Sequence, residues 1–244
     1  MELHEVVDLS LPVGASTQVY PGDPEVRFDV HSTIERDGFN LLSVRMGSQS
    51  GTHVDAPYHF SETGKRIDEL PLERFAGPAV VVDATDAGAR GRILWRHIEP
   101  VADRIRPGTI VLFRTGWSRH YGTDAYFENP FLDAGACAEL IARGVRTFGL
   151  DASNIDETPD STHPGEGFPV HHLIADVDGV ICENLTRLDA VTFDDPFVSL
   201  LPIAFEAADG APVRAVAMRL GSGGQVEERS VAATPAAAWS AEPR

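Results

Sequence analysis

Cysteine and positive charge are both scarce in this chain of 244 residues. Only Cys137 and Cys182 are present, far apart and without a Cys-x-x-Cys spacing, so neither a disulfide framework nor a thiolate zinc site is expected. The 20 Lys and Arg residues face 37 Asp and Glu residues, which gives a formal net charge of −17. Because nucleic-acid phosphates are bound by basic patches, this balance argues against a nucleic-acid partner.

Long hydrophobic runs are lacking as well. No stretch approaches the roughly 20 apolar residues of a membrane span, and residues 1–7 show no basic region followed by an apolar run. We therefore expect a cytoplasmic protein with no membrane partner. Hydrophobic residues make up 43% of the chain and charged residues 23%, which is ordinary for a globular protein long enough for one well-buried domain.

The apolar runs predict an α/β fold in which strands and helices alternate. Strands are expected at residues 5–11, 26–34, 40–46, 79–83, 109–114, 145–150, 180–182, 197–205 and 213–219. Helices are expected at residues 95–105, 134–143 and 170–177, the second of them capped by Asp133 and stopped by Gly144. The Asp-Gly pair in residues 208–211 predicts a hairpin turn.

Two segments stand outside this pattern. Residues 152–167 are rich in Pro, Gly and polar side chains, and a loop of this length in a compact domain is often a functional lid. It carries His163, which we interpret as a solvated loop histidine. The composition of residues 221–244 shifts to Gly, Ala, Glu and Pro, so we expect a domain over residues 1–220 followed by a weakly ordered tail or one docked on a neighbouring subunit.

Most groups that bind metals or move protons lie in residues 48–60, Ser-Gln-Ser-Gly-Thr-His-Val-Asp-Ala-Pro-Tyr-His-Phe. If this segment is extended, its odd-numbered side chains share one face, and His53 and Asp55 are close enough to bind one cation. Pro57 predicts a bend before His59. His-x-Asp alone is equally typical of a buried histidine that hydrogen-bonds a carboxylate.

The longer string Gly-Thr-His-Val-Asp-Ala-Pro-Tyr-His-Phe resembles the signature of the metal-dependent cyclase and bacterial kynurenine formamidase family, His-x-Gly-Thr-His-x-Asp-x-Pro-x-His. In that family both early histidines and the aspartate bind metal, and the last histidine transfers protons. The resemblance implies that His53 and Asp55 are ligands and that His59 is the general acid/base. Gln49 stands where the family has its first histidine.

Residues 169–185 resemble the family's second motif, in which a helix histidine and a glutamate twelve positions later at a strand end bind metal. The corresponding residues are His171 and Glu183. His172 would face elsewhere on the helix, although a shift of one residue would exchange the two histidines. Glu183 could alternatively pair with an arginine.

The glutamine at position 49 bears on the metal. Family formamidases use two zinc ions, and an amide is at best a weak oxygen ligand, so we expect one tightly held ion, with Gln49 as an additional oxygen donor. Histidines and carboxylates without thiolates suit Mn²⁺ or Zn²⁺. The related isatin hydrolases use a single manganese ion.

Three aromatic residues are candidates for substrate contact. Tyr20 precedes Pro-Gly-Asp, and Trp117 lies in Arg-Thr-Gly-Trp-Ser after an expected strand; both segments resemble family segments near the pocket. Phe28 is a third candidate. By residue type alone, Tyr20 packing beside its turn and Trp117 anchoring the core are equally open.

The leading hypothesis is a metal-dependent hydrolase that cleaves an amide, lactam or ester bond of a small aromatic or cyclic molecule by a metal-activated water. One alternative is a biosynthetic cyclase, dehydratase or isomerase on the same scaffold, and another is a degenerate binding protein. The resemblance further implies a single cyclase-type α/β domain with a mixed sheet and flanking helices, and assembly into homodimers or homotetramers.

Overall fold

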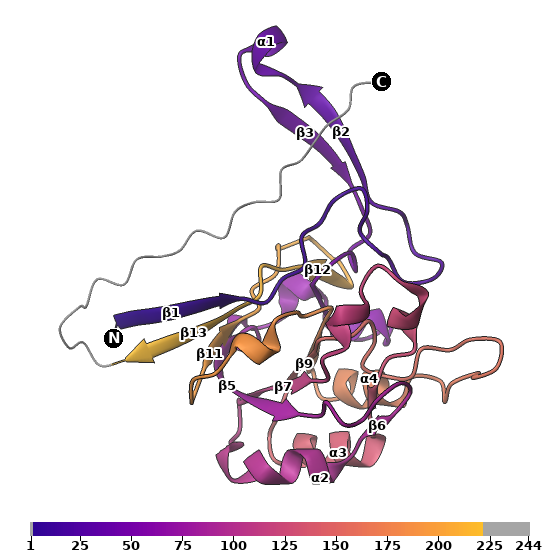
Figure 1. Ribbon diagram of the computed structural model, residues 1–244, viewed down its shortest axis with the longest axis vertical. Helices are drawn as coiled ribbons and strands as arrows, with labels where there is room; N and C mark the ends of the chain where they lie inside the picture. Colours follow the sequence, from indigo (N-terminus) through magenta and orange to yellow (C-terminus); the bar gives the residue numbers. More distant parts are fainter. Residues whose placement is uncertain (1, 222–244) are drawn as a thin grey trace.

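A nine-stranded mixed sheet organises the computed structural model, which describes residues 2–221. The strand order is β1-β13-β11-β5-β7-β9-β10-β4-β12, so both ends of the described chain meet at one edge of the sheet (Figure 1). The four central strands β5, β7, β9 and β10 are parallel, and the flanking strands are antiparallel. The predicted α/β class with a mixed sheet is confirmed.

The strands of this sheet are β1 (Glu2–Asp8), β4 (His53–Asp55), β5 (Ala76–Asp83), β7 (Ile110–Arg114), β9 (Thr147–Leu150), β10 (Val180–Glu183), β11 (Phe197–Ser199), β12 (Gly210–Pro212) and β13 (Val216–Gly221). Two further ribbons pair β2 (Arg27–Ser32) with β3 (Leu41–Arg45) and β6 (Arg92–Ile93) with β8 (Phe131–Leu132). The α-helices are α1 (Ile34–Asp37), α2 (Trp95–Ile98), α3 (Ala134–Ala142) and α4 (Pro169–Ala175). Short 3-10 helices cover Pro57–His59, Ile67–Glu69, Leu72–Arg74, Glu99–Arg104, Trp117–His120, Asp124–Phe127 and Leu188–Ala190.

The central strands are apolar because both faces of the sheet are covered. All four residues of β9 and of β10 are buried, as are the first four residues of β7. One hydrophobic core lies between the sheet and the helices α2, α3 and α4, and a second core lies on the opposite face (Figure 1). Strands buried on both faces need continuous apolar runs, which is why the sequence predicted these strands well.

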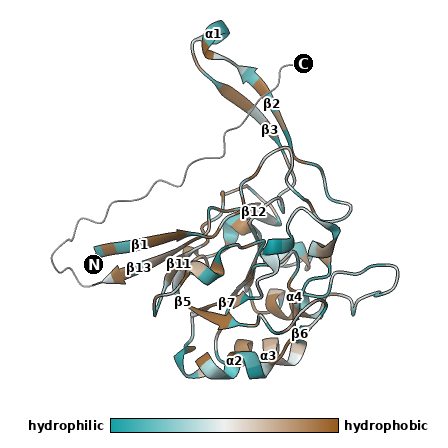
Figure 2. Cartoon of the chain, in the orientation of Figure 1, coloured by the Kyte–Doolittle hydropathy of each residue, from teal (hydrophilic) through white to brown (hydrophobic). Residues whose placement is uncertain are grey.

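The hairpin formed by β2 and β3, with α1 at its tip, extends away from the body of the molecule (Figure 1). We call residues 27–45 the arm. Phe28 pairs with Val44 and Val30 pairs with Leu42, so these four side chains share one face. Val30, Leu42 and Val44 are 58%, 44% and 50% exposed, and the arm's strands appear as brown patches in Figure 2. The arm therefore presents apolar surface that its own chain does not cover.

Several predicted elements differ from the observed ones. Residues 95–105 form a turn of α-helix followed by a 3-10 helix, since Pro100 interrupts the α-helical hydrogen bonding. Only His53–Asp55 of the expected extended segment is a strand. The predicted hairpin turn at residues 208–211 is wrong, because β12 pairs with β4 rather than with its sequence neighbours.

Helix α3 matches its predicted cap. The Asp133 side chain accepts a hydrogen bond from the backbone N–H of Ala136, and Gly144 has a left-handed backbone with φ of 88°. Among the described helices, none combines the length and apolar character that a membrane crossing requires. Apart from Gly221, the predicted tail lies outside the described residues.

Candidate metal centre

The register of the sheet brings the four charged residues predicted as ligands to one place. Strand β4 runs antiparallel to β10 with His53 opposite Glu183, and Asp55 lies two residues further along β4 on the same face. Helix α4 supplies His171 from above the sheet, packed against β10. All four side chains are buried.

Their polar atoms lie within reach of one small cation. His53 Nε2 is 3.2 Å from Asp55 Oδ1 and 3.8 Å from Glu183 Oε2. His171 Nε2 is 3.6 Å from Asp55 Oδ2 and 3.6 Å from Glu183 Oε1. Ligand atoms of His53, Asp55 and Glu183 all lie within 4.8 Å of one another. These separations are typical of atoms that share a metal ion at about 2.0–2.2 Å each.

The His53 imidazole is oriented by its other nitrogen. His53 Nδ1 lies 2.9 Å from the Gly51 carbonyl oxygen, which also accepts a hydrogen bond from Asn184 Nδ2. A carbonyl only accepts, so Nδ1 carries a proton and Nε2 faces the carboxylates. Gly51 has φ of 70°, a left-handed conformation that turns this carbonyl toward the ring. Gly51 thus positions His53.

The His171 imidazole is held in the same way by a carboxylate. His171 Nδ1 lies 2.8 Å from Asp156 Oδ2. The Asp156 carboxylate also accepts hydrogen bonds from the backbone N–H groups of Val170 and His171. Asp156 therefore fixes both the ring and the first turn of α4. Metal-bound histidines commonly carry such a carboxylate on the nitrogen that does not bind the metal.

Electrostatics in the cluster favour added positive charge. Burial alone lowers the pKa of His53, but Asp55 and Glu183 outweigh it and raise the pKa to about 9. For His171, burial is likewise outweighed, chiefly by Asp156 and Asp55, and the pKa rises to about 10. Burial and the charge of Asp55 raise the pKa of Glu183 to about 7. Without a metal, the carboxylates thus hold protons on both imidazoles, and a divalent cation can take the place of those protons.

The donors present fit a divalent metal. Asp55 Oδ1 is buried, and although His53 Nε2 lies 3.2 Å away, the two groups are not aligned for a hydrogen bond. A buried carboxylate oxygen held in this way is better satisfied by a cation between the two groups. Two imidazoles and two carboxylates suit Zn²⁺ or Mn²⁺. Both thiols, Cys137 and Cys182, are buried, and neither belongs to this group of ligand atoms.

A cavity of about 230 Å³ opens beside the cluster. His53, His59, His171 and Glu183 line it together with Gln49. Much of the remaining lining is aromatic and comes from Tyr20, Phe60, Tyr126, Phe127 and Phe168. The Phe60 ring lies 4.1 Å from the His171 ring, and Tyr20 meets Phe127 edge to face at 6.1 Å. The cavity can therefore hold a flat ring next to the candidate ligands.

His59 and Gln49 both contact Asp209, a residue that the sequence did not suggest. Pro57 begins a 3-10 helix, and this predicted bend turns His59 to the cavity wall. His59 Nδ1 lies 3.0 Å from Asp209 Oδ2, and Gln49 Nε2 donates to the same oxygen at 2.9 Å. Gln49 Oε1 is buried without a hydrogen-bond partner.

Two of the predicted substrate contacts do not lie at the cavity. Trp117 is buried in the core, where its indole N–H donates to the backbone oxygens of Ala125 and Tyr126. Phe28 is half-buried on the arm, which projects from the body. Neither the family resemblance that suggested Trp117 nor the expected strand that carries Phe28 reveals which way a loop or arm leaves the sheet.

Two further histidines, His172 and His163, are placed as the sequence suggested. His172 is exposed while His171 is buried, so the helix register assigned to α4 is the one observed. His163 is an exposed loop residue whose ring lies 3.1 Å from Asp160 Oδ1.

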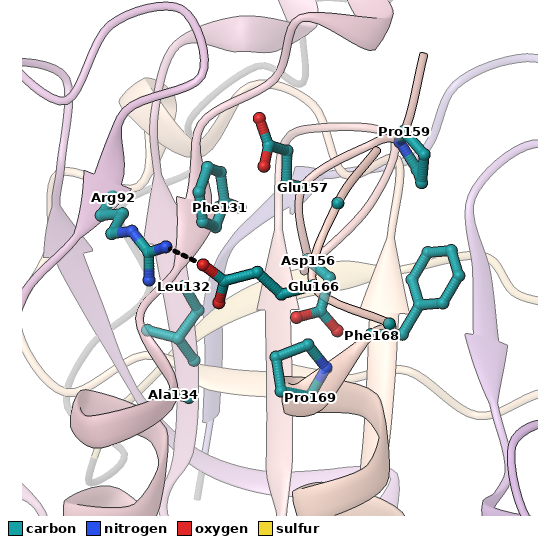
Figure 3. A pocket seen from close by; sticks show the side chains of 12 residues that line it. Arg92, Phe131, Leu132, Ala134, Asp156, Glu157, Pro159, Glu166, Phe168 and Pro169 are labelled. Carbon is teal, nitrogen blue, oxygen red and sulfur yellow. Dashed lines mark hydrogen bonds and ion pairs between the residues drawn. The ribbon is translucent and has the colours of Figure 1, made fainter. Parts of the chain in front are cut away.

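Two arginines, Arg90 and Arg92, hold the loop between β9 and α4 against the body. Arg92 pairs with Glu166 at 2.6 Å beside a water-sized hollow of about 10 Å³ that Asp156 and Phe168 also line (Figure 3). Arg90 donates to Glu157 and to the Thr158 carbonyl oxygen. The loop therefore contributes Asp156 and Phe168 from an anchored position.

Three residues with clear roles in this geometry were missed from sequence: Asn184, Asp156 and Asp209. Asn184 follows Glu183 directly and adopts a left-handed backbone with φ of 59°, a strained conformation that often marks a site. Asp156 and Asp209 lie in loops, and their partners are 15 and 150 residues away in the chain. No local pattern connects such pairs.

The chain matches a family model described as "Putative cyclase" over residues 7–157. Kynurenine formamidase of Bordetella petrii is 35% identical over 216 residues, covering 88% of this chain and 98% of that protein. The chain belongs to the putative cyclase family. The family assignment made from residues 51–60 and 169–185 is confirmed.

Solved structures of cyclase-family proteins and their relatives share the fold. Isatin hydrolase A from Ralstonia solanacearum superposes with a TM-score of 0.77 at 26% identity, covering 88% of this chain and 91% of that one. A structure described as a potential metal-dependent hydrolase with cyclase activity gives a TM-score of 0.73 at 28% identity, covering 89% and 99%. These alignments cover 88% and 89% of this chain, so the cyclase-type fold is confirmed.

Proposed function

We propose that this chain is a metal-dependent hydrolase that cleaves an amide, lactam or ester bond in a small aromatic or cyclic molecule. The observation that carries the proposal is the pair of buried imidazoles, His53 and His171. Each is held at Nδ1 and presents Nε2 to Asp55 and Glu183 at the wall of an aromatic cavity. The kinship with kynurenine formamidases and isatin hydrolase points to the same chemistry.

The proposed metal ligands are His53, Asp55, His171 and Glu183. The ion is Mn²⁺ or Zn²⁺, and we propose one ion per chain, because Gln49 offers at best a weak amide oxygen where a histidine would provide a strong ligand. A divalent ion bound by these residues supplies a Lewis acid that lowers the pKa of a bound water and polarises a carbonyl.

His59 is the proposed proton carrier. It lines the cavity, its Nδ1 is bonded to Asp209, and its Nε2 is therefore free to accept a proton and return it to the leaving group. Burial lowers the pKa of His59, but Asp209 and Asp55 outweigh this effect and the pKa is raised.

The aromatic lining supports a flat substrate. Tyr20, Phe60 and Phe168 line the cavity beside His171, so a planar ring can pack between them while its carbonyl faces the ligands. We propose Tyr20 as a substrate contact within one chain. Phe28 lies on the projecting arm and would contact substrate only in the cavity of another subunit. Trp117 would contact substrate only if the core around it repacked.

We further propose that the chain works as a homodimer or homotetramer in the cytoplasm. A two-stranded hairpin is marginal by itself in water, and the apolar face of the arm gains stability when a second copy covers it. Cys137 and Cys182 are free and buried, which suits a reducing compartment. The catalytic domain is proposed to span residues 1–220, with residues 221–244 as a tail.

The test is metal analysis paired with an activity screen. Purified protein is analysed for Mn and Zn and then assayed with N-formylkynurenine and with isatin, following the product by mass. We expect about one divalent ion per chain, a product heavier than the substrate by one water in the isatin assay and loss of formate from the other substrate. Chelation should abolish turnover and re-addition of metal should restore it. A metal-loaded protein that converts a substrate without hydrolysis would support the cyclase alternative, and one that holds no divalent metal would support the binding protein.

A further inference from the structure

Asp209 lies beside His59 although 150 residues separate them in the sequence. The sheet explains this proximity. Strand β12 pairs with β4 so that Gly210 lies opposite Asp55, and the backbone N–H of Ala56 donates to the Asp209 carbonyl oxygen at 2.8 Å. The residue before β12 is thereby fixed next to the residues that follow β4. The backbone of Asp209 is thus held by the same ladder that orders the candidate metal ligands.

The Asp209 carboxylate contacts three protein donors. Ser48 Oγ donates to Oδ1 at 2.8 Å, and Gln49 Nε2 donates to Oδ2 at 2.9 Å. His59 Nδ1 lies 3.0 Å from Oδ2. A carboxylate in an exposed ion pair usually keeps free lone pairs for water, whereas three protein donors here fix its plane.

This arrangement fixes the proton of the His59 ring. Gln49 Nε2 also lies 3.3 Å from His59 Nδ1, but it donates to Asp209 Oδ2 at the shorter distance of 2.9 Å. Because the Asp209 carboxylate can only accept, its 3.0 Å contact with His59 requires a proton on Nδ1, and Nε2 is then the nitrogen that can accept one. We infer that Asp209 is a positioning residue for the proposed hydrolysis, which holds His59 in the Nδ1–H tautomer with Nε2 available on the cavity side. The expected effect on kcat rests on the proposed function, whereas the assignment of the His59 tautomer does not.

The inference also gives Gln49 a function in this chain. Its amide nitrogen binds Asp209, and the side chain packs so closely on β12 that a Cβ at Gly210 would lie 2.7 Å from Nε2 and 2.5 Å from the Val54 oxygen. Glycine at position 210 is therefore needed for this packing. Gln49 accordingly steadies the carboxylate that positions His59, while its buried Oε1 remains directed away from that bond.

The experiment is a double-mutant cycle on the zinc-loaded enzyme. Asp209→Ala, Asp209→Asn, His59→Ala and the double variant His59→Ala/Asp209→Ala are assayed with N-formylkynurenine and isatin. His163→Ala is the control, because it removes an exposed loop imidazole that also contacts a carboxylate, Asp160, and does not line the cavity. Zinc content and thermal melting are measured for every variant. The Asn variant keeps the volume and an acceptor and therefore tests the charge even if the Ala variant folds poorly.

We expect Asp209→Ala to lower kcat by about 10- to 100-fold with KM changed less than about threefold and zinc content unchanged. Asp209→Asn should lie between it and wild type, and His163→Ala within about threefold of wild type. In the His59→Ala background, Asp209→Ala should change kcat by less than about twofold, because its effect passes through His59. An equal loss in both backgrounds would overturn the inference.

A second readout does not depend on activity. Long-range ¹H–¹⁵N NMR of zinc-loaded protein reports which ring nitrogen of His59 is protonated, with His59→Ala used for assignment. We expect Nδ1–H in wild type and in His163→Ala, and a shift toward Nε2–H in Asp209→Ala. An unchanged tautomer in Asp209→Ala would overturn the inference. If wild type hydrolyses neither substrate, the proposed function fails, while the NMR result still decides the role of Asp209.

Discussion

At the scale of single residues, the candidate centre depends on atoms that do not face it. His53 and His171 present Nε2 to Asp55 and Glu183 because the Gly51 carbonyl oxygen and Asp156 hold their Nδ1 atoms. Because both rings are already oriented before an ion binds, less side-chain freedom is lost on binding, and this raises metal affinity.

Replacement of His59 tests the proton carrier. His59→Ala should leave metal content unchanged, because the ring is bonded to Asp209 and not to Asp55 or Glu183, and should lower turnover by about 10²- to 10⁴-fold. Metal analysis and steady-state kinetics measure the two effects. His163→Ala, which removes an exposed loop imidazole, is the control. Full turnover in His59→Ala would remove this residue from the mechanism.

Metal binding should strengthen as pH rises. In the metal-free protein the pKa of His53 is about 9 and that of His171 about 10, so both rings are protonated at neutral pH and must lose protons to bind the ion. Apparent affinity should increase between pH 6 and pH 8 by about tenfold per pH unit for each proton displaced. Calorimetry in two buffers of different ionisation enthalpy measures the released protons. Affinity independent of pH would contradict protonated rings.

At the scale of elements, one loop carboxylate connects helix α4 to the centre. Asp156 accepts hydrogen bonds from two N–H groups of the first turn and from the His171 ring. Asp156→Ala should weaken metal binding by about 10- to 100-fold and lower the free energy of unfolding of the metal-free protein by about 1–3 kcal/mol, because buried donors lose their acceptor. Metal titration and urea unfolding measure these changes.

The matched control for that element is Asp133→Ala. Asp133 caps α3 in the same manner, accepting a hydrogen bond from Ala136, but the structure places it on the helix rather than in the cluster. Its loss should lower stability by about 1 kcal/mol and leave metal affinity unchanged. Equal weakening of metal binding by both variants would show that Asp156 acts through general stability alone.

Sequence patterns were most informative where the structure is locally determined. Apolar runs predicted β7, β9 and β10. The two motifs predicted that His53, Asp55, His171 and Glu183 lie together, and the structure places them together. The extended face expected for residues 49–59 is observed only over His53–Asp55, and the bend predicted at Pro57 is the start of a 3-10 helix.

Long-range contacts account for what sequence patterns did not predict. The Asp-Gly pair resembles a hairpin turn, yet pairing of β12 with β4 uses Gly210 as a strand residue and sends Asp209 to His59. Asp156 likewise acts across the loop that separates it from α4. Partner choice of this kind is set by tertiary packing, not by local propensity.

At the scale of the whole molecule, the candidate metal centre lies in the body, on β4, β10 and α4, whereas the arm projects away from the body (Figure 1). The face formed by Phe28, Val30, Leu42 and Val44 is the surface we expect a second copy to cover. Val30→Lys combined with Leu42→Lys should lower the molecular mass measured by light scattering to that of a monomer. Each lysine would have to be buried without a partner at the interface.

Lysines on the other face of the arm provide the control. Asp29 pairs with Ser43 on that face, so Asp29→Lys with Ser43→Lys adds the same residue type without entering the apolar face and should leave the oligomer intact. A wild-type protein that is monomeric at micromolar concentration would contradict this assembly.

The most direct test of the central claim is an anomalous-scattering crystal structure of the protein loaded with Zn²⁺ or Mn²⁺. The account predicts one strong peak per chain, about 2.0–2.3 Å from Nε2 of His53 and His171 and from oxygens of Asp55 and Glu183. A peak elsewhere, or a loaded protein with those four side chains free of the ion, would contradict it.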